Sequence, residues 1–161
     1  MNMTRNMTKQ TMPVELLLTV ALTVGAQNAD KLYKEAKALL DAKNYTEAVP
    51  KLQQAADKGH KKAQYRLGKC YKEGWGVEKD RKKATQYYAL SARQGYAKAQ
   101  YQLGKAYLKG KGVPADEQQA KSWLTKAVKD DKHGKEILDK MRAEAASGDA
   151  DAKKMLTLIG K

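Results

Sequence analysis

Apolar and small residues recur along the chain at the spacing of an α-helix. One set falls at positions i, i+3, i+4 and i+7 and so shares one helical face: Gln64, Leu67, Gly68 and Tyr71. A second set continues in the same way to i+8: Ala84, Tyr87, Tyr88, Ser91 and Ala92. The pattern predicts two amphipathic helices in succession, which we term helix A and helix B, and an all-α fold.

The same pattern returns after 36 residues. Of the 30 positions from 63 to 92, 12 carry the identical residue in the segment 99–128. A fixed period of this length is typical of repeat proteins, in which each unit is one small group of elements that stacks on its neighbours. The chain is therefore expected to form a solenoid of antiparallel helix pairs.

Turn residues predict where the helices begin and end. Gly74 and Gly110 can adopt a left-handed backbone and are expected to end helix A of the two copies. Asp80 is expected to cap the first helix B, and Asp116, with Gln119 three residues later, is expected to form a capping box.

Gly68 and Gly104 lie inside the predicted helices, where glycine costs about 1 kcal/mol relative to alanine. Such a cost calls for a structural reason. We expect close approach of a partner helix that carries Tyr87 or Trp123.

The repeat pattern divides the chain into segments. A helix over 29–40 and a degraded helix B precede the first clear copy, and two helices near 135–146 and 149–159 are expected to cap the array. Asp131 stands where a glycine ends the first helix B, so the path after residue 130 is left open. The predicted organisation is a separate segment 1–26, then a helical repeat domain 27–161 made of a tetratricopeptide-like hairpin (27–59), two clear repeats (60–131) and capping helices (132–161).

Residues 1–26 have the order of features found in a secretory signal peptide. Arg5 and Lys9 precede an apolar run at 16–24, and small residues end at Ala26, before Gln27. Pro13 and the acidic residue beside the run are less typical, and an amphipathic or disordered tail is the alternative. The signal-peptide interpretation predicts an exported protein, periplasmic or extracellular, that is not an integral membrane protein.

The repeated motif resembles the Sel1-like repeat, a relative of the tetratricopeptide repeat. It comprises Leu-Gly and a following Tyr, a Gly-x-Gly-Val turn, an Asp cap and an Ala-x-x-aromatic stretch. In the first copy these are Leu67, Gly68, Tyr71, Gly74, Gly76, Val77, Asp80, Ala84, Tyr87 and Tyr88, and in the second Leu103, Gly104, Tyr107, Gly110, Gly112, Val113, Asp116, Ala120, Trp123 and Leu124.

This resemblance implies a right-handed α/α superhelix with a concave inner face, and a role as an adaptor or scaffold in protein complexes. It also implies an exported bacterial-type member. Some exported relatives hold each repeat with a disulfide, but this chain has one cysteine and no such pair is possible.

Composition adds a strong positive charge. Lys and Arg outnumber Asp and Glu by 32 to 18, for a net charge of +14. An acidic partner or an anionic surface would suit this charge. The alternative is that the lysines, which are spread along the chain, only solvate the outer faces of the helices.

By analogy with tetratricopeptide pairs, helix A supplies the concave face. The residues expected to line it, which we term the helix-A face, are Lys62, Tyr65, Lys69 and Lys72 of the first copy and Lys98, Tyr101, Lys105 and Leu108 of the second. Ammonium groups beside tyrosine rings would suit an extended acidic peptide. Equally, the tyrosines could pack between repeats while the lysines face water.

No catalytic pattern is evident in the sequence. His60 and His133 lie far apart without companion ligands, Cys70 is replaced by Ala106 in the second copy, and the glycine turn follows a helix, which is the wrong context for a dinucleotide fingerprint. The sequence predicts a non-catalytic protein-protein interaction scaffold without cofactor or metal, and specific nucleic-acid binding is not expected. The alternative is a basic envelope protein that binds anionic polymers or lipid head groups.

Overall fold

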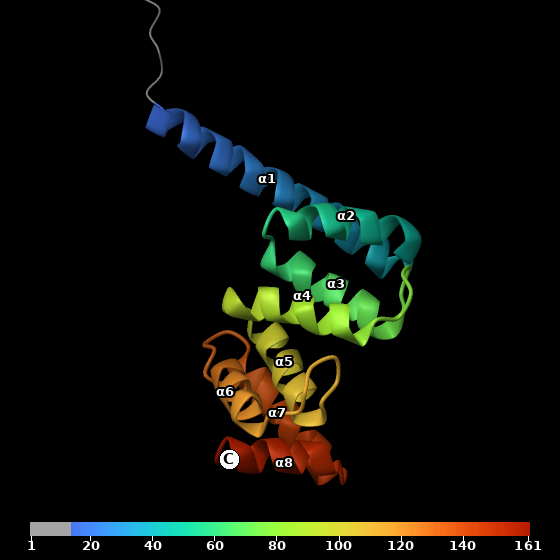
Figure 1. The fold of residues 1–161 in the computed structure, drawn as a ribbon, viewed down its shortest axis with the longest axis vertical. Helices are drawn as coiled ribbons and strands as arrows, with labels where there is room; N and C mark the ends of the chain where they lie inside the picture. The colour runs from blue at the N-terminus through green and yellow to red at the C-terminus, as the bar shows by residue number, and fades with distance from the viewer. Residues whose placement is uncertain (1–13) are drawn as a thin grey trace, which may run out of the picture.

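The computed structural model describes residues 14–161, which form helices and no strands. Four helix pairs stack in chain order to give an elongated α/α solenoid (Figure 1). This confirms the fold class expected from the sequence. The helices are α1 (Val14–Asp41), α2 (Tyr45–Asp57), α3 (Lys61–Glu73), α4 (Arg81–Arg93), α5 (Ala97–Lys109), α6 (Glu117–Val128), α7 (Gly134–Ala146) and α8 (Ala150–Leu158).

The two clear repeats fold alike because the same residues end and begin their helices. Helices α3 and α5 end at Gly74 and Gly110, which have left-handed backbones with φ of 80° and 61°. Helices α4 and α6 begin after Asp80 and Asp116, whose carboxylates each accept a backbone N–H at 2.9 Å. Both predicted caps are confirmed.

The capping box at Asp116 is only half formed. Its carboxylate accepts the backbone N–H of Gln119, but its own N–H donates to the carbonyl of Tyr107 at 3.0 Å. Asp80 makes the equivalent bond to Tyr71 at 2.9 Å. The cap residue therefore ties the turn back to helix A, and the glutamine side chain is not needed to satisfy that N–H.

The glycine-rich turns also join neighbouring repeats. A Cβ atom on Gly76 would lie 2.5 Å from the carbonyl oxygen of Tyr45, and one on Gly112 would overlap the carbonyl oxygen of Arg81. Tyr45 and Arg81 are the first residues of the preceding helix B in each case. Each turn thus packs its backbone directly against the backbone of the preceding repeat.

The glycines inside helix A do permit close approach, but of different residues than expected. A Cβ atom on Gly68 would lie 2.8 Å from the ring of Tyr88, and one on Gly104 would lie 2.7 Å from Leu124. The expected contacts with Tyr87 and Trp123 were therefore wrong by one position. Tyr87 instead stacks on Tyr71, and its hydroxyl donates to Gln53 at 3.0 Å.

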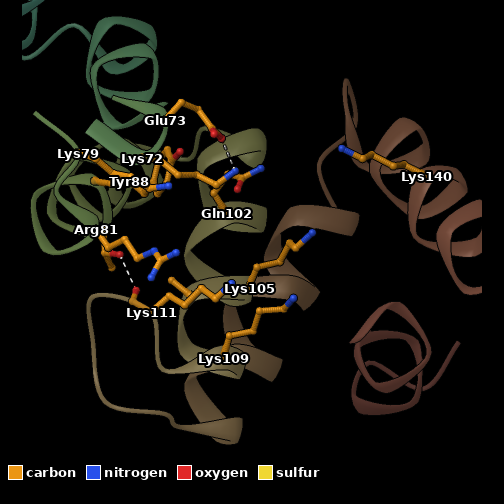
Figure 2. Close-up of a pocket in the computed structure, with 13 residues that line it drawn as sticks. Lys72, Glu73, Lys79, Arg81, Tyr88, Gln102, Lys105, Lys109, Lys111 and Lys140 are labelled. Atoms are coloured by element: carbon orange, nitrogen blue, oxygen red, sulfur yellow. Dashed lines mark hydrogen bonds and ion pairs between the residues drawn. The ribbon is translucent and has the colours of Figure 1, made fainter. Parts of the chain in front are cut away.

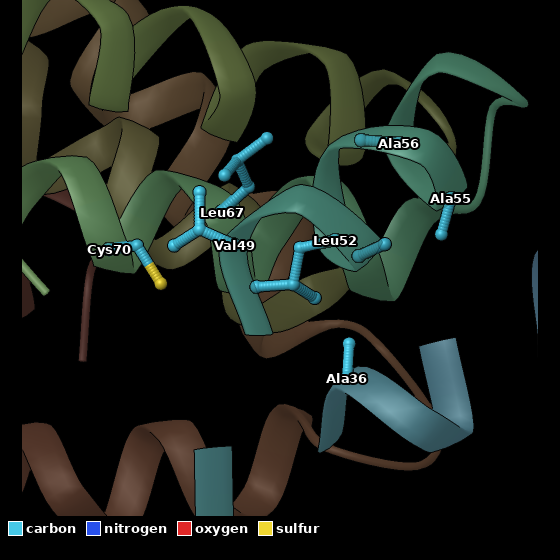
Figure 3. Close-up of a cluster of buried hydrophobic side chains, with 8 residues drawn as sticks. Ala36, Val49, Leu52, Ala55, Ala56, Leu67 and Cys70 are labelled. Carbon is cyan, nitrogen blue, oxygen red and sulfur yellow. The ribbon is translucent and has the colours of Figure 1, made fainter. Parts of the chain in front are cut away.

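The core is a series of clusters between stacked helices. One joins α1, α2 and α3 (Figure 3) and contains Ala36, Val49, Leu52, Ala55, Ala56, Ala63, Leu67 and Cys70. Further clusters follow between α4 and α5 and around α6, α7 and α8. Repeated glutamines support the stacking, because Gln64 and Gln100 each donate at 3.2 Å to a carbonyl near the end of the preceding helix B.

Helix α1 is longer than the helix expected over 29–40. It runs without interruption past residue 26, where the expected signal peptide ends, and Figure 1 shows its N-terminal part projecting beyond α2. Leu18, Leu22 and Val24 are exposed there, and Ala29 is buried. No helix within the described residues is both long and apolar enough to span a membrane. Residues 1–13, including Arg5 and Lys9, lie outside the described part of the chain.

The path after residue 130 is set by Asp130. Its carboxylate accepts the backbone N–H groups of Lys132 and His133 at 3.1 and 2.6 Å, which turns the chain into α7. Helices α7 and α8 lie close to the two capping helices expected at the C-terminus.

Candidate binding face

The first half of the helix-A face, on α3, divides into two environments. Lys62 and Lys72 are exposed, and Lys72 pairs with Glu73 at 2.8 Å. Lys69 is half-buried, with its ammonium 5.3 Å from the centre of the Trp75 ring. Its burial lowers the pKa of the Lys69 ammonium, because a charged group is harder to keep away from water.

Tyr65 lies in an aromatic cluster between repeats. Its ring meets that of Tyr96 edge-on at 5.2 Å and that of Tyr88 at 5.9 Å. Burial raises the pKa of the Tyr65 hydroxyl. This tyrosine therefore stabilises the stacking of the two repeats.

The second half of the face, on α5, is largely covered by α7. Tyr101 is only 3% exposed, and its hydroxyl donates to a carboxylate oxygen of Glu144 at 3.2 Å. Lys98 pairs with Glu136 at 3.1 Å, and Leu108 packs at the edge of the C-terminal core cluster. Lys105 is a half-buried cation that forms no ion pair among the described residues, and its ammonium lies 5.3 Å from the centre of the Tyr101 ring.

The eight predicted residues therefore do not form one continuous surface. The tyrosines pack between helices, which is the alternative that the sequence left open, and they do not supply rings to a groove. The lysines remain near the surface, and burial lowers the pKa of Lys105 as it does that of Lys69. Any binding by this face must rely on its cations.

A basic cleft opens where the two repeats meet, with a volume of about 400 Å³. In the view of Figure 2, Lys72, Lys79 and Arg81 lie on one side of α5 and Lys140 of α7 lies on the other. We use the term basic cleft for this site, whose cations are Lys72, Lys79, Arg81, Lys105, Lys109, Lys111 and Lys140. Glu73 is the one carboxylate among its lining residues.

Several of these cations form no ion pair. Lys72 pairs with Glu73, Lys109 with Asp151 and Lys140 with Glu144. Within the described part of the chain, no ion pair is formed by the other four: Lys79, Arg81, Lys105 and Lys111. An anion entering the cleft would therefore meet ammonium and guanidinium groups that are not engaged in ion pairs.

A smaller cleft of about 200 Å³ lies one repeat earlier. Lys69, Arg66 and Cys70 occupy positions there that correspond to Lys105, Gln102 and Ala106 in the basic cleft, 36 residues on. This smaller cleft contains Asp41 and fewer cations. A cleft thus occurs at equivalent positions of two successive repeats, but positive charge is concentrated in only one of the two clefts.

Of the residues predicted for the helix-A face, Lys72 and Lys105 line this cleft, whereas its other cations were not among the predicted residues. Lys79 and Lys111 lie in the inter-helix turns, and Arg81 begins α4. The turn that contains Lys111 packs against α4 of the preceding repeat, where the Thr85 hydroxyl donates to the carbonyl of Lys111 at 2.9 Å, and this contact brings Lys111 near Arg81. No signal in the sequence indicated Lys140, because the repeat pattern fades before α7.

Cys70 and the two histidines have structural roles. Cys70 is buried in the first core cluster, and burial raises the pKa of its thiol to about 11, so it stays protonated at neutral pH. His60 is half-buried at the start of α3. Its Nδ1 caps α3 by accepting the N–H of Ala63 at 3.1 Å, and its ring stacks on Tyr33. Within residues 14–161 there is no group of acidic, histidine or cysteine residues that could hold a metal.

Comparisons with known proteins agree with this architecture. The family model of the Sel1 repeat matches residues 61–96 and 97–131. A Sel1 repeat protein from Oxalobacter formigenes has a similar solved structure, with a TM-score of 0.61 and 29% identity over 79% of this chain and 54% of that one. The protein c5321, a protective antigen of uropathogenic Escherichia coli strains with an SLR fold, gives a TM-score of 0.62 and 29% identity over 81% of this chain and 28% of that one.

A third structure, the cysteine-rich protein B of Helicobacter pylori, has a TM-score of 0.57 and 23% identity over 89% of this chain and 98% of that one, and shows the shared fold. The chain spans about half of the first of these proteins and little more than a quarter of the second. A search of curated proteins finds no match.

Proposed function

The chain belongs to the Sel1 repeat family, and on that premise we propose that it is a non-catalytic scaffold whose helix-A face binds an acidic segment of another protein. Proteins of this family generally act as protein-interaction scaffolds. The observation that carries the proposal is the row of clefts between repeats, in which lysines of helix A lie beside cations that have no acidic partner.

An extended peptide fits this arrangement better than a compact protein surface does. Lys69 and Lys105 are equivalent residues of successive repeats, each in its own cleft. A segment lying across both repeats could place one carboxylate near each ammonium. Half-buried cations interact more strongly with an incoming carboxylate than fully exposed ones, since water screens them less.

Reversal of both charges tests this proposal. We expect Lys69→Glu with Lys105→Glu to weaken binding of a glutamate-rich peptide by roughly tenfold or more at physiological salt, because each like-charge contact opposes the peptide. The melting temperature should fall by only a few degrees, since neither lysine makes an ion pair within the described residues and each loses one cation–π contact worth about 0.5–1 kcal/mol. Fluorescence anisotropy with a labelled peptide measures the affinity, and circular dichroism measures the melting.

A matched control makes the same change in net charge away from the two clefts. Lys82 and Lys129 are exposed and line neither cleft, and Lys129 lies one 36-residue period after Arg93, an exposed residue of α4. Lys82→Glu with Lys129→Glu should leave peptide affinity within about twofold. Equal loss of affinity in both double variants would contradict the proposal. It would show that the overall positive charge attracts the peptide, as it would attract an anionic polymer, and that the helix-A face has no special role.

We also propose that residues 1–26 act as an export signal and that the repeat domain works outside the cytoplasm. The exposed Leu18, Leu22 and Val24 support this, because the N-terminal part of α1 adds little to the repeat core. Removal of this segment would leave α1 from Gln27 onward, including the buried Ala29 and Ala36.

A further inference from the structure

One core position differs in chemistry from its equivalents in the adjacent repeats. Tyr88 lies 36 residues after Leu52 and 36 before Leu124, and all three side chains are buried. Leucine therefore satisfies the packing at this place in two of the three helix pairs. Tyrosine adds a ring and a hydroxyl that the fold does not require.

The hydroxyl of Tyr88 has no hydrogen-bond partner. Among the described residues, its oxygen is the only buried side-chain polar atom without a hydrogen-bond partner. Burying a hydroxyl without a partner costs free energy, and buried polar groups in proteins nearly always have one. The ring cannot easily turn to find a partner, because it is held against the backbone of α3 at Gly68.

Tyr88 lies in the wall of the basic cleft. Figure 2 shows it next to Lys72 and Lys79, on the same side of α5 as Arg81. Tyr88 lines the cleft, but its unsatisfied hydroxyl is itself buried, so a ligand reaches that hydroxyl only when the side chains that cover it move aside. The cleft volume of about 400 Å³ is on the scale of a small-molecule site. Burial strongly raises the pKa of the Tyr88 hydroxyl, so it keeps its proton and can donate.

We propose that the basic cleft is a binding site for a small anion that carries two or more phosphoryl groups, one of which accepts a hydrogen bond from the Tyr88 hydroxyl. A phosphoryl group brings about −1.5 to −2 charges and three acceptor oxygens, whereas a carboxylate brings one charge and two oxygens. Lys79, Arg81, Lys105 and Lys111 all line this cleft, so an anion of high charge density is attracted by several cations at once. Arg81 adds a planar guanidinium suited to two oxygens of one phosphoryl group.

This site does not depend on the proposed function. Both proposals use Lys105, but the acidic segment is also expected to engage Lys69, which lies in the smaller cleft, whereas the small anion is expected to engage Tyr88, which does not line that cleft. Either proposal can therefore fail without the other.

Inorganic tripolyphosphate is the probe for the test, with isothermal titration calorimetry of the full chain at physiological salt. We expect one tripolyphosphate per chain. Tyr88→Phe should lower the affinity roughly tenfold, as expected for loss of a hydrogen bond to a charged group. The melting temperature of Tyr88→Phe without ligand should equal or exceed that of the wild type, because the unsatisfied hydroxyl is gone.

Two further variants separate the cleft from general charge. Lys105→Glu with Lys111→Glu should abolish measurable binding, while Lys82→Glu with Lys129→Glu should retain it within about twofold. The proposal is overturned if Tyr88→Phe binds tripolyphosphate as tightly as the wild type, or if the two double variants lose affinity equally. Citrate, a tricarboxylate, should bind at least tenfold more weakly than tripolyphosphate, and equal affinity would contradict the phosphoryl assignment.

Discussion

Gly112→Ala should destabilise the protein by about 3 kcal/mol and lower its melting temperature by roughly 6–12 °C. Two costs combine in this substitution. Gly112 has φ of 77°, where an alanine is strained, and the added Cβ would overlap the backbone carbonyl of Arg81 in the preceding repeat. A backbone atom cannot move aside as a flexible side chain can, so the repeats themselves must separate slightly.

Gly95→Ala is the matched control for this prediction. Gly95 has almost the same φ of 75°, but a Cβ atom there would meet nothing within 4 Å. Its replacement should cost only the backbone strain, about 1 kcal/mol. Thermal denaturation followed by circular dichroism compares the two variants. If Gly112→Ala is no more destabilising than Gly95→Ala, the turns do not hold the repeats together as described.

Truncation of Leu67 should destabilise the chain to a similar degree. Leu67 is fully buried in the first core cluster, where α3 meets α2 (Figure 3). Leu67→Ala removes apolar contacts and leaves a cavity, which typically costs 2–5 kcal/mol. That is a large part of the total stability expected for a natural domain, about 5–15 kcal/mol. Chemical denaturation measures the change in the free energy of unfolding.

Leu90 provides the comparison for Leu67. Its side chain is 43% exposed on the outer surface of α4. Leu90→Ala should change the free energy of unfolding by less than about 1 kcal/mol. Similar losses of stability in the two variants would contradict the placement of the core between the stacked helices.

The fold was predictable because residues at fixed positions of the repeat mark where its helices begin and end. Gly74 and Gly110 end helix A, and Asp80 and Asp116 begin helix B, at the residues that the sequence indicates. Each of these signals is local, and each occurs twice. The start of helix α1 was not predictable in this way. Residues 14–28 have no counterpart in the repeats that would mark a helix end, and the helix continues through them.

Contacts between neighbouring elements were less predictable. Tyr87 and Tyr88 are adjacent and both aromatic, so helical spacing alone did not decide which one meets Gly68. The burial of Tyr101 depends on Glu144 and the surrounding part of α7, where the sequence no longer follows the repeat. The orientation of a helix depends on what packs against it, and that partner was not identifiable from the motif.

The candidate site likewise contains some residues that the repeat pattern identified and others that it did not. The equivalence of Lys69 and Lys105 followed from the 36-residue period, and both do lie in clefts between repeats. The unpaired cations Lys79, Arg81 and Lys111 come from turns and a helix start, which only the stacked structure brings together. The missing partner of the Tyr88 hydroxyl is likewise a property of the folded chain alone.

The most direct test of the central claim is to map where an acidic peptide binds. In an NMR titration of the isotope-labelled chain with a glutamate-rich peptide at physiological salt, amide shifts should change along α3 and α5, above all around Lys69 and Lys105. The outer surface of α4, with Gln86 and Arg93, should remain unchanged. Shift changes concentrated on that outer surface, or spread evenly over the lysines of both faces, would contradict the assignment of the helix-A face as the binding surface.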